Sequence, residues 1–274
     1  MLDLSSDTKW LKLQLLEDKK ILIIKINNLE LKNALSDEVI DDLVAILSSI
    51  DKNENVRVAL LGGVGSIFCA GGDIKAMREK SGMFSGDSNQ LRENYRKGIQ
   101  RIPKVIEGLS TPLIGVVNGA AIGAGVDLAC MCDFRVGCET SFFAETFSKL
   151  ALVPGDGGTY FLPRVVGYPK AMEMFLTGDK YDSKEALKIG LLNYVFSCED
   201  LWDQAVKIAE KISNNSPMAI TMTKKALRSS WINCDLGSHL DLLATFQGET
   251  QRTNDHEEGL MALKEKRRPN FLGN

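Results

Sequence analysis

The feature that most constrains the fold is a strand, a glycine-rich loop and a small-residue helix in succession between residues 113 and 133. The apolar run at residues 113–117 is typical of a buried strand. Three glycines follow it, Gly119, Gly123 and Gly125. Glycine lets a backbone approach a ligand closely, and the first N–H groups of a helix are free to donate to that ligand. The sequence therefore predicts a ligand pocket here, with a helix from about Ala124.

Asp127 lies near the start of this predicted helix, where a carboxylate interacts favourably with the helix dipole and can face the pocket. The structural alternative is that the glycines serve tight packing and the aspartate caps the helix. A second segment of the same plan, residues 68–75 with Gly71 and Gly72, favours the ligand pocket.

Composition and charge exclude several classes of protein. The 274 residues are 44% hydrophobic and 25% charged, which is ordinary for a globular protein. The net charge of −3 argues against a nucleic-acid partner. No apolar run approaches the roughly 20 residues that span a bilayer, and the polar, acid-containing residues 1–9 do not resemble a signal peptide. We expect a cytoplasmic protein with no nucleic-acid or membrane partner.

The cysteines and histidines give no sign of a metal site. The six cysteines are Cys69, Cys130, Cys132, Cys138, Cys198 and Cys234. Their spacing fits neither a zinc pattern nor a Cys-x-x-Cys redox pair. We expect free, buried thiols in a reducing compartment.

The order of apolar runs predicts an α/β core followed by helices. Residues 11–16 and 20–26 read as a hairpin, and Ser36 as the N-cap of a helix. Alternating strands and helices to about residue 196 favour mostly parallel pairing. Residues 79–94 look irregular, and residues 95–109 read as one helix. Four helices are expected beyond Cys198, at 200–213, 216–231, 235–252 and 255–265, with a boundary near residue 200.

Taken together, these motifs resemble the crotonase superfamily, also called the enoyl-CoA hydratase/isomerase family. The matching stretches are residues 32–36, 68–75, 118–133, 154–159, 162–164, 216–217, 258–259 and 265–267. They occur in the order that the family shows and extend over nearly the whole chain. Each stretch alone is weak evidence for the family, whereas the ordered set is strong evidence.

The resemblance implies an α/β fold with a crotonase-like spiral core of repeated β-β-α turns and a C-terminal helical part. Residues 1–200 would form the acyl-CoA-binding catalytic core, and residues 201–274 a helical region that mediates trimerisation. The protein would be a homotrimer, or a hexamer made of two trimers. It would need no cofactor, since coenzyme A is part of the substrate.

The resemblance also assigns an oxyanion hole to the backbone N–H groups of Gly72 and Ala124. Two fixed donors polarise the thioester carbonyl, and losing one such donor typically raises a barrier by about 3–4 kcal/mol. Coenzyme A would be bound by Lys32, Ala70, Asp73 and Ile74, together with basic residues of the C-terminal tail.

One departure from the family pattern bears on the reaction. Hydratases of the two-acid type use a pair of glutamates, and Asp127 occupies the place of the first. The second lies 14 residues after the aspartate that matches Asp133, and this chain has Phe147 there.

Our leading interpretation is an enoyl-CoA hydratase in which Asp127 handles the proton. The loss of the second acid favours an enoyl-CoA Δ-isomerase, because one carboxylate suffices for a 1,3 proton shift. An acyl-CoA thioester hydrolase and a non-catalytic CoA-binding protein remain further alternatives.

Two nearby acids are candidates to replace the missing one. Asp156 lies in the Pro-Gly-Asp-Gly-Gly turn, as a second catalytic acid or as the N-cap of the next helix. Glu145 precedes Phe147 by two residues, which on a helix is about 200° away, so it would be poorly placed unless the segment is irregular. If Asp127 works in an apolar pocket, desolvation should raise its pKa.

Overall fold

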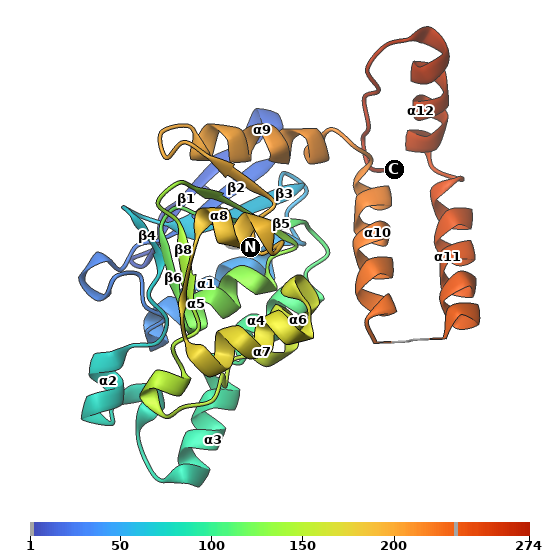
Figure 1. Cartoon of the computed structure of the whole chain (residues 1–274). Helices are drawn as coiled ribbons and strands as arrows, with labels where there is room; N and C mark the ends of the chain where they lie inside the picture. Colours follow the sequence, from blue (N-terminus) through green and yellow to red (C-terminus); the bar gives the residue numbers. More distant parts are fainter. Residues whose placement is uncertain (1–2, 233–234) are drawn as a thin grey trace.

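The computed structural model describes residues 3–232 and 235–274, and these residues form two sheets covered by helices (Figure 1). The larger sheet has the strand order β1-β2-β3-β5-β7-β10. Its strands are β1 (Leu11–Leu16), β2 (Ile21–Ile26), β3 (Val58–Gly63), β5 (Leu113–Val117), β7 (Phe134–Cys138) and β10 (Tyr194–Phe196). β1 and β2 form the predicted antiparallel hairpin, and the other neighbouring pairs of this sheet are parallel.

The smaller sheet has the order β4-β6-β8-β9. Its strands are β4 (Ile67–Cys69), β6 (Ala120–Ile122), β8 (Phe142–Ala144) and β9 (Lys180–Asp182). β3, β5 and β7 of the larger sheet are each followed by a strand of the smaller sheet and then by a helix. This succession is the repeated β-β-α turn that the sequence predicts.

Helices make up most of the remaining structure. They are α1 (Asp37–Ile50), α2 (Ile74–Glu79), α3 (Ser88–Lys97), α4 (Arg101–Gly108), α5 (Ala124–Met131), α6 (Gly158–Val166), α7 (Tyr168–Thr177), α8 (Ser183–Lys188), α9 (Leu201–Ser213), α10 (Pro217–Ser230), α11 (Leu236–Thr250) and α12 (Asn254–Glu265). None of these helices combines the length and the apolar character that crossing a bilayer requires. The predicted cap of α1 is present, since the Ser36 hydroxyl accepts a hydrogen bond from the Val39 N–H.

The segment between β4 and β5 is more helical than its composition indicates. Residues 88–97, expected to be largely irregular, form α3, whose first turn is capped by the Asp87 carboxylate. The single helix expected at 95–109 is also wrong, because the chain leaves the helical conformation at Gly98 and begins α4 at Arg101. A side chain at Gly98 would lie 2.7 Å from the Met83 sulfur, so this break is fixed by close packing.

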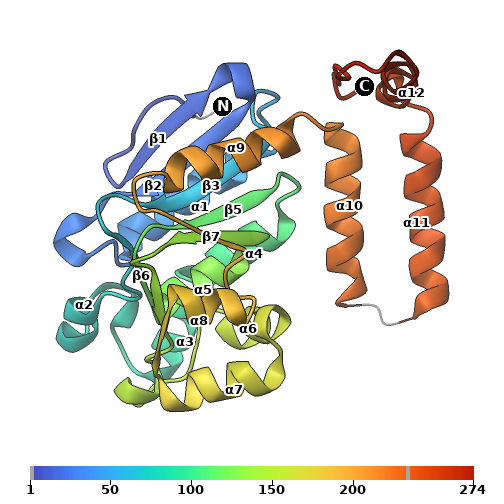
Figure 2. The same ribbon diagram turned by 45° about the horizontal axis from the view of Figure 1, so that its top comes forward.

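The C-terminal part is helical from Leu201 onward, as the sequence predicts. α9 lies across the larger sheet and buries Leu201, Ala205 and Ala209 against it. α10, α11 and α12 stand to one side of the sheets in both views (Figures 1 and 2). The boundary at residue 200 and the role of these helices in trimerisation stay predictions.

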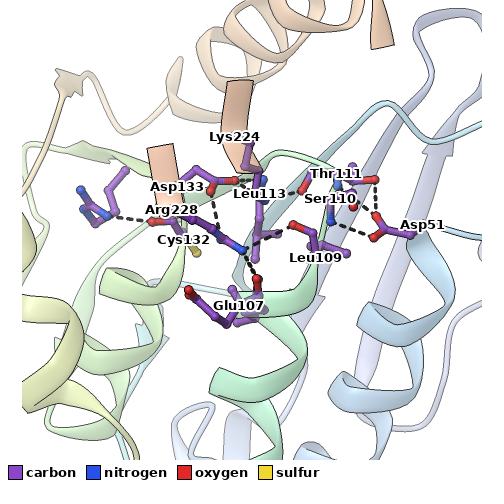
Figure 3. A network of polar contacts seen from close by, with 12 residues as sticks. Asp51, Glu107, Leu109, Ser110, Thr111, Leu113, Cys132, Asp133, Lys224 and Arg228 are labelled. Atoms are coloured by element: carbon purple, nitrogen blue, oxygen red, sulfur yellow. Dashed lines mark hydrogen bonds and ion pairs between the residues drawn. The ribbon is translucent and has the colours of Figure 1, made fainter. Parts of the chain in front are cut away.

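A polar network around the buried Lys224 attaches α10 to the core (Figure 3). The Lys224 ammonium donates to the Thr111 carbonyl at 2.6 Å and to the Asp133 carboxylate at 2.7 Å. The Arg228 guanidinium donates to the Glu107 carbonyl at 2.5 Å and to Asp133 at 3.1 Å. Because Asp133 lies between α5 and β7, these bonds connect α10 to the helix that carries Asp127.

Replacing Lys224 by methionine should weaken this attachment. The change keeps most of the buried stem, but it removes two hydrogen bonds and leaves the Thr111 carbonyl without its charged donor. We expect a loss of about 2–3 kcal/mol in the free energy of unfolding, measured by urea denaturation. The matched control is Lys225→Met at the neighbouring exposed position, which should change stability by less than about 0.5 kcal/mol. Equal effects of the two substitutions would contradict the assignment.

Candidate active site

The two glycine-rich segments singled out in the sequence lie against each other. At the start of α5, a side chain on Gly125 would overlap the Cys69 carbonyl at the end of β4. A Cβ on Gly71 would lie 2.6 Å from the Ile122 carbonyl oxygen and 3.4 Å from the amide nitrogen of Ala124. Gly71 also has a φ of +92°, a conformation that favours glycine. Close approach of two backbones therefore explains why these positions carry no side chain.

This packing places the amides of Gly72 and Ala124 in neighbouring segments. Neither N–H donates a hydrogen bond to another group of residues 3–232 or 235–274. Ala124 is the first residue of α5, so its N–H has no partner within the helix. The two predicted oxyanion donors are thus brought together and are free to bind a ligand oxygen.

Three carboxyl groups meet beside these amides. Asp127 comes from α5, Glu145 from the residue after β8, and Asp156 from the turn before α6. Their exposed fractions are 0%, 0% and 3%. The Asp127 carboxyl is within hydrogen-bonding reach of the other two. Within the described ranges, no other residue offers a hydrogen-bond donor to any of the six carboxyl oxygens.

Burial and mutual repulsion raise the pKa of all three groups. Desolvation raises the pKa of Asp127 well above its ordinary value, and the charges of Asp156 and Glu145 raise it further. Desolvation raises the pKa of Glu145 to about 8. The pKa of Asp156 is raised by its burial, and the nearby Asp127 carboxyl offsets this rise in part. Because three adjacent charges are costly in a buried site, the cluster retains protons near neutral pH and contains both an acid and a base.

The structure decides two questions that the sequence left open about these acids. Glu145 is not on a helix: β8 ends at Ala144 and the chain continues in irregular structure, so the side chain reaches Asp127. The segment is thus irregular, the case in which the sequence left Glu145 open as a replacement acid. Asp156 does not cap α6, whose N-cap is Gly157. The sequence could name Glu145 only as a candidate, because it does not show whether the segment after the strand is helical or irregular.

Glycine residues and aromatic side chains surround the three carboxyl groups. A Cβ on Gly158 would overlap the Asp127 carboxyl, so α6 can approach Asp127 only with glycine at this position. Phe147 stands where the family's second glutamate is expected, and its ring would lie 3.7 Å from a Cβ on Gly123. On the other side, Tyr95 lies beside Gly155, where a Cβ would be 2.8 Å from the ring.

Apolar side chains from α2 and α3 extend this enclosure to the segment that holds Gly72. The Phe84 and Tyr95 rings meet edge to face, with their centroids 6.2 Å apart. A Cβ on Gly72 would lie 2.6 Å from the terminal carbon of Met77 and 3.8 Å from Phe84. Apolar side chains thus reach from the Gly72 amide to the turn that carries Asp156.

The residues expected to bind coenzyme A lie around the same segment. The exposed Lys32 accepts a hydrogen bond at its backbone carbonyl from the Ala70 N–H, at 3.1 Å. Asp73 caps α2 by accepting a hydrogen bond from the Ala76 N–H at 2.9 Å, and Ile74 is 55% exposed. Their contacts with coenzyme A stay predictions. Within residues 3–232 and 235–274, no group of three or more potential ligands is arranged to hold a metal ion.

Comparison with known proteins agrees with this geometry. The family model described as enoyl-CoA hydratase/isomerase matches residues 17–274. The chain is 32% identical to crotonyl-CoA hydratase of Syntrophomonas wolfei, over 93% of this chain and 96% of that protein. It is 35% identical to the peroxisomal Δ(3,5)-Δ(2,4)-dienoyl-CoA isomerase of Arabidopsis thaliana, over 93% of each. The crystal structure of enoyl-CoA hydratase from Bacillus anthracis superposes with a TM-score of 0.89 at 32% identity, covering 97% of this chain and 100% of that one.

The fold, the paired amides and the buried acids define an α/β protein of the crotonase type. The chain belongs to the enoyl-CoA hydratase/isomerase family. The relatives named above are a hydratase and an isomerase, so the chain belongs to a family of enzymes.

The raised pKa of Glu145 should appear in the pH dependence of stability. In the unfolded chain this group ionises near its ordinary pKa of 4.5, whereas in the folded protein it stays protonated to about 8. The folded state then binds more protons across this range, so stability falls as pH rises. Glu145→Gln should reduce the fall between about pH 5 and 8 by roughly 2–4 kcal/mol, measured by urea unfolding at each pH. The exposed Glu139→Gln is the control, and identical pH profiles for the two variants would contradict the burial of a proton at Glu145.

Proposed function

We propose that this enzyme hydrates the double bond of an enoyl-CoA thioester. The observation that carries the proposal is that three buried carboxyls lie together beside two backbone amides, neither of which donates to another group within residues 3–232 and 235–274. Hydration needs a base for water and an acid for the α-carbon, and this cluster supplies both. The proposal therefore does not depend on an acid at position 147.

In the proposed reaction the N–H groups of Gly72 and Ala124 donate to the thioester oxygen. This polarisation makes the β-carbon electrophilic and stabilises the enolate that forms. Asp127, at the centre of the cluster, removes a proton from water as the oxygen adds to the β-carbon. Asp156 returns a proton to the α-carbon, and Glu145 shares the remaining proton with Asp127.

An enoyl-CoA isomerase is the second candidate. Phe147 supports the isomerase, because its aromatic ring lies near Gly123, at the position where two-acid hydratases have a carboxylate. A single carboxylate such as Asp127 can remove a proton from one carbon and return it to another. The relatives named above include a hydratase and an isomerase at similar identity, so they favour neither reaction.

Two substrates distinguish the candidates. With crotonyl-CoA, hydration removes the conjugated enoyl absorbance, and with a 3-enoyl-CoA, isomerisation creates it. We expect loss of absorbance with crotonyl-CoA, and a fall in kcat of about 10²–10⁴-fold in Asp127→Asn, because the amide cannot accept the proton. Asp203→Asn, at an exposed position of α9, is the matched control and should retain activity.

Each other outcome assigns a different function. A gain of absorbance with the 3-enoyl substrate and no hydration would make the protein an isomerase. Release of free thiol from acyl-CoA would make it a thioester hydrolase. Binding of coenzyme A esters without any product would make it a non-catalytic binding protein.

We also propose that the enzyme assembles as a trimer or as a hexamer of two trimers, in the cytoplasm. Large apolar side chains are exposed on α10 and α11, and they support an interface there. They include Leu227, Leu236 and Leu240, with exposed fractions of 63%, 69% and 54%. Clusters of exposed apolar residues commonly mark association surfaces.

Sedimentation equilibrium tests this assembly. We expect the mass of three or six chains for the unmodified protein and smaller species for Leu240→Glu, because a carboxylate would be buried in the interface. The control is Leu29→Glu, which changes an equally exposed leucine at 59% elsewhere in the chain. A monomeric unmodified protein would contradict the proposal.

A further inference from the structure

Two cysteines that the proposed reaction does not use lie at the ends of neighbouring strands. β7 and β10 pair in parallel, and Cys138, the last residue of β7, lies opposite Phe196. Cys198 follows two residues later. Cys198 lies in the turn that directly follows β10.

The Thr140 hydroxyl joins the two thiols. Its oxygen lies 3.4 Å from the sulfur of Cys138 and 3.3 Å from that of Cys198. Cys138 is buried, whereas Cys198 is exposed to solvent. The pair thus consists of an accessible thiol and a protected thiol held near it by the same hydroxyl.

The pKa of the accessible thiol is also lowered. Hydrogen bonds from Cys138 and from Thr140 lower the pKa of Cys198 below its ordinary value, which favours the nucleophilic thiolate. By contrast, burial raises the pKa of Cys69, Cys130 and Cys132 to about 12. An oxidant should therefore react with Cys198 before any of these three buried thiols.

We propose that Cys138 and Cys198 form a reversible disulfide when the protein meets hydrogen peroxide, so that this pair is a redox modification site. Cys198 is the attacking thiol, and Cys138 is the thiol that resolves the intermediate.

Both steps balance with one molecule of peroxide. The Cys198 thiolate attacks one peroxide oxygen, the O–O bond breaks, and the departing hydroxide takes a proton to become water. This leaves a sulfenic acid on Cys198. The Cys138 sulfur then attacks the Cys198 sulfur, the S–O bond breaks, and the second hydroxide takes the Cys138 proton. Two thiols lose two electrons in total, and peroxide is reduced to two molecules of water.

The disulfide would fasten the short edge strand β10 to β7 and fix the segment that leads into α9. A cross-link between residues 138 and 198 closes a long loop and removes conformational freedom from the unfolded chain. We therefore expect the oxidised protein to melt several degrees higher than the reduced protein, and dithiothreitol to abolish the difference.

The experiment treats the full-length protein with hydrogen peroxide and then counts free thiols after denaturation. Cys234 lies outside the described residues, so it is replaced by serine in every sample to remove its contribution. We expect two fewer thiols per chain, a Cys138–Cys198 linked peptide by mass spectrometry, and full recovery with dithiothreitol. Cys130 and Cys132 serve as internal controls and should stay reduced.

Cys198→Ser is the matched variant, because the exposed position tolerates the change without affecting folding. In this variant peroxide should consume no pair of thiols and should leave the melting temperature unchanged. The proposal is overturned if Cys198 of the parent protein proceeds to sulfinic acid while Cys138 stays reduced. It is also overturned if Cys198 forms only disulfides between chains on a non-reducing gel.

Discussion

The site depends on the contact between the backbone of α5 and the end of β4. A side chain at Gly125 would overlap the Cys69 carbonyl, and one at Gly119 would overlap the Ser66 carbonyl. Glycine at these positions therefore sets the distance between the β3-β4-α2 turn and the β5-β6-α5 turn. That distance brings the amides of Gly72 and Ala124 into neighbouring segments, and no side-chain chemistry could restore the arrangement if the turns were held apart.

The same close packing makes the acid cluster possible. Three carboxyls in an apolar enclosure would repel one another strongly if all were ionised. Here desolvation raises their pKa values, so protons shared within the cluster replace the counter-charges that a buried carboxylate normally needs. Gly158 leaves room for Asp127 at the start of α6. A site held protonated by its own burial is suited to move protons to and from a bound thioester, which connects the packing to the chemistry of the family.

The parts of the fold that rest on local patterns could be predicted. The β1–β2 hairpin, the Ser36 cap, the start of α5 and the C-terminal helices are all confirmed, because alternation, capping and helical periodicity are encoded over a few residues. α3 could not be recognised from its polar composition, since its stability rests on the Asp87 cap and on contacts such as that between Tyr95 and Phe84. Glu145 could be named only as a candidate for a related reason: its direction depends on where β8 ends, and that end is set by pairing with β6 and β9.

By itself, the sequence determined the resemblance to the family, which implied the repeated strand-strand-helix order. It also determined the glycines that allow two backbones to meet, because they are written in residue type and spacing. Only the tertiary structure decided that Asp127, Glu145 and Asp156 share one buried site. These residues lie on three separate segments, and their contact depends on how the α5, β8 and α6 regions pack together. Phe147 illustrates this difference between sequence and structure. The sequence shows that position 147 has no acid, and the fold shows that acids from neighbouring segments lie in the site.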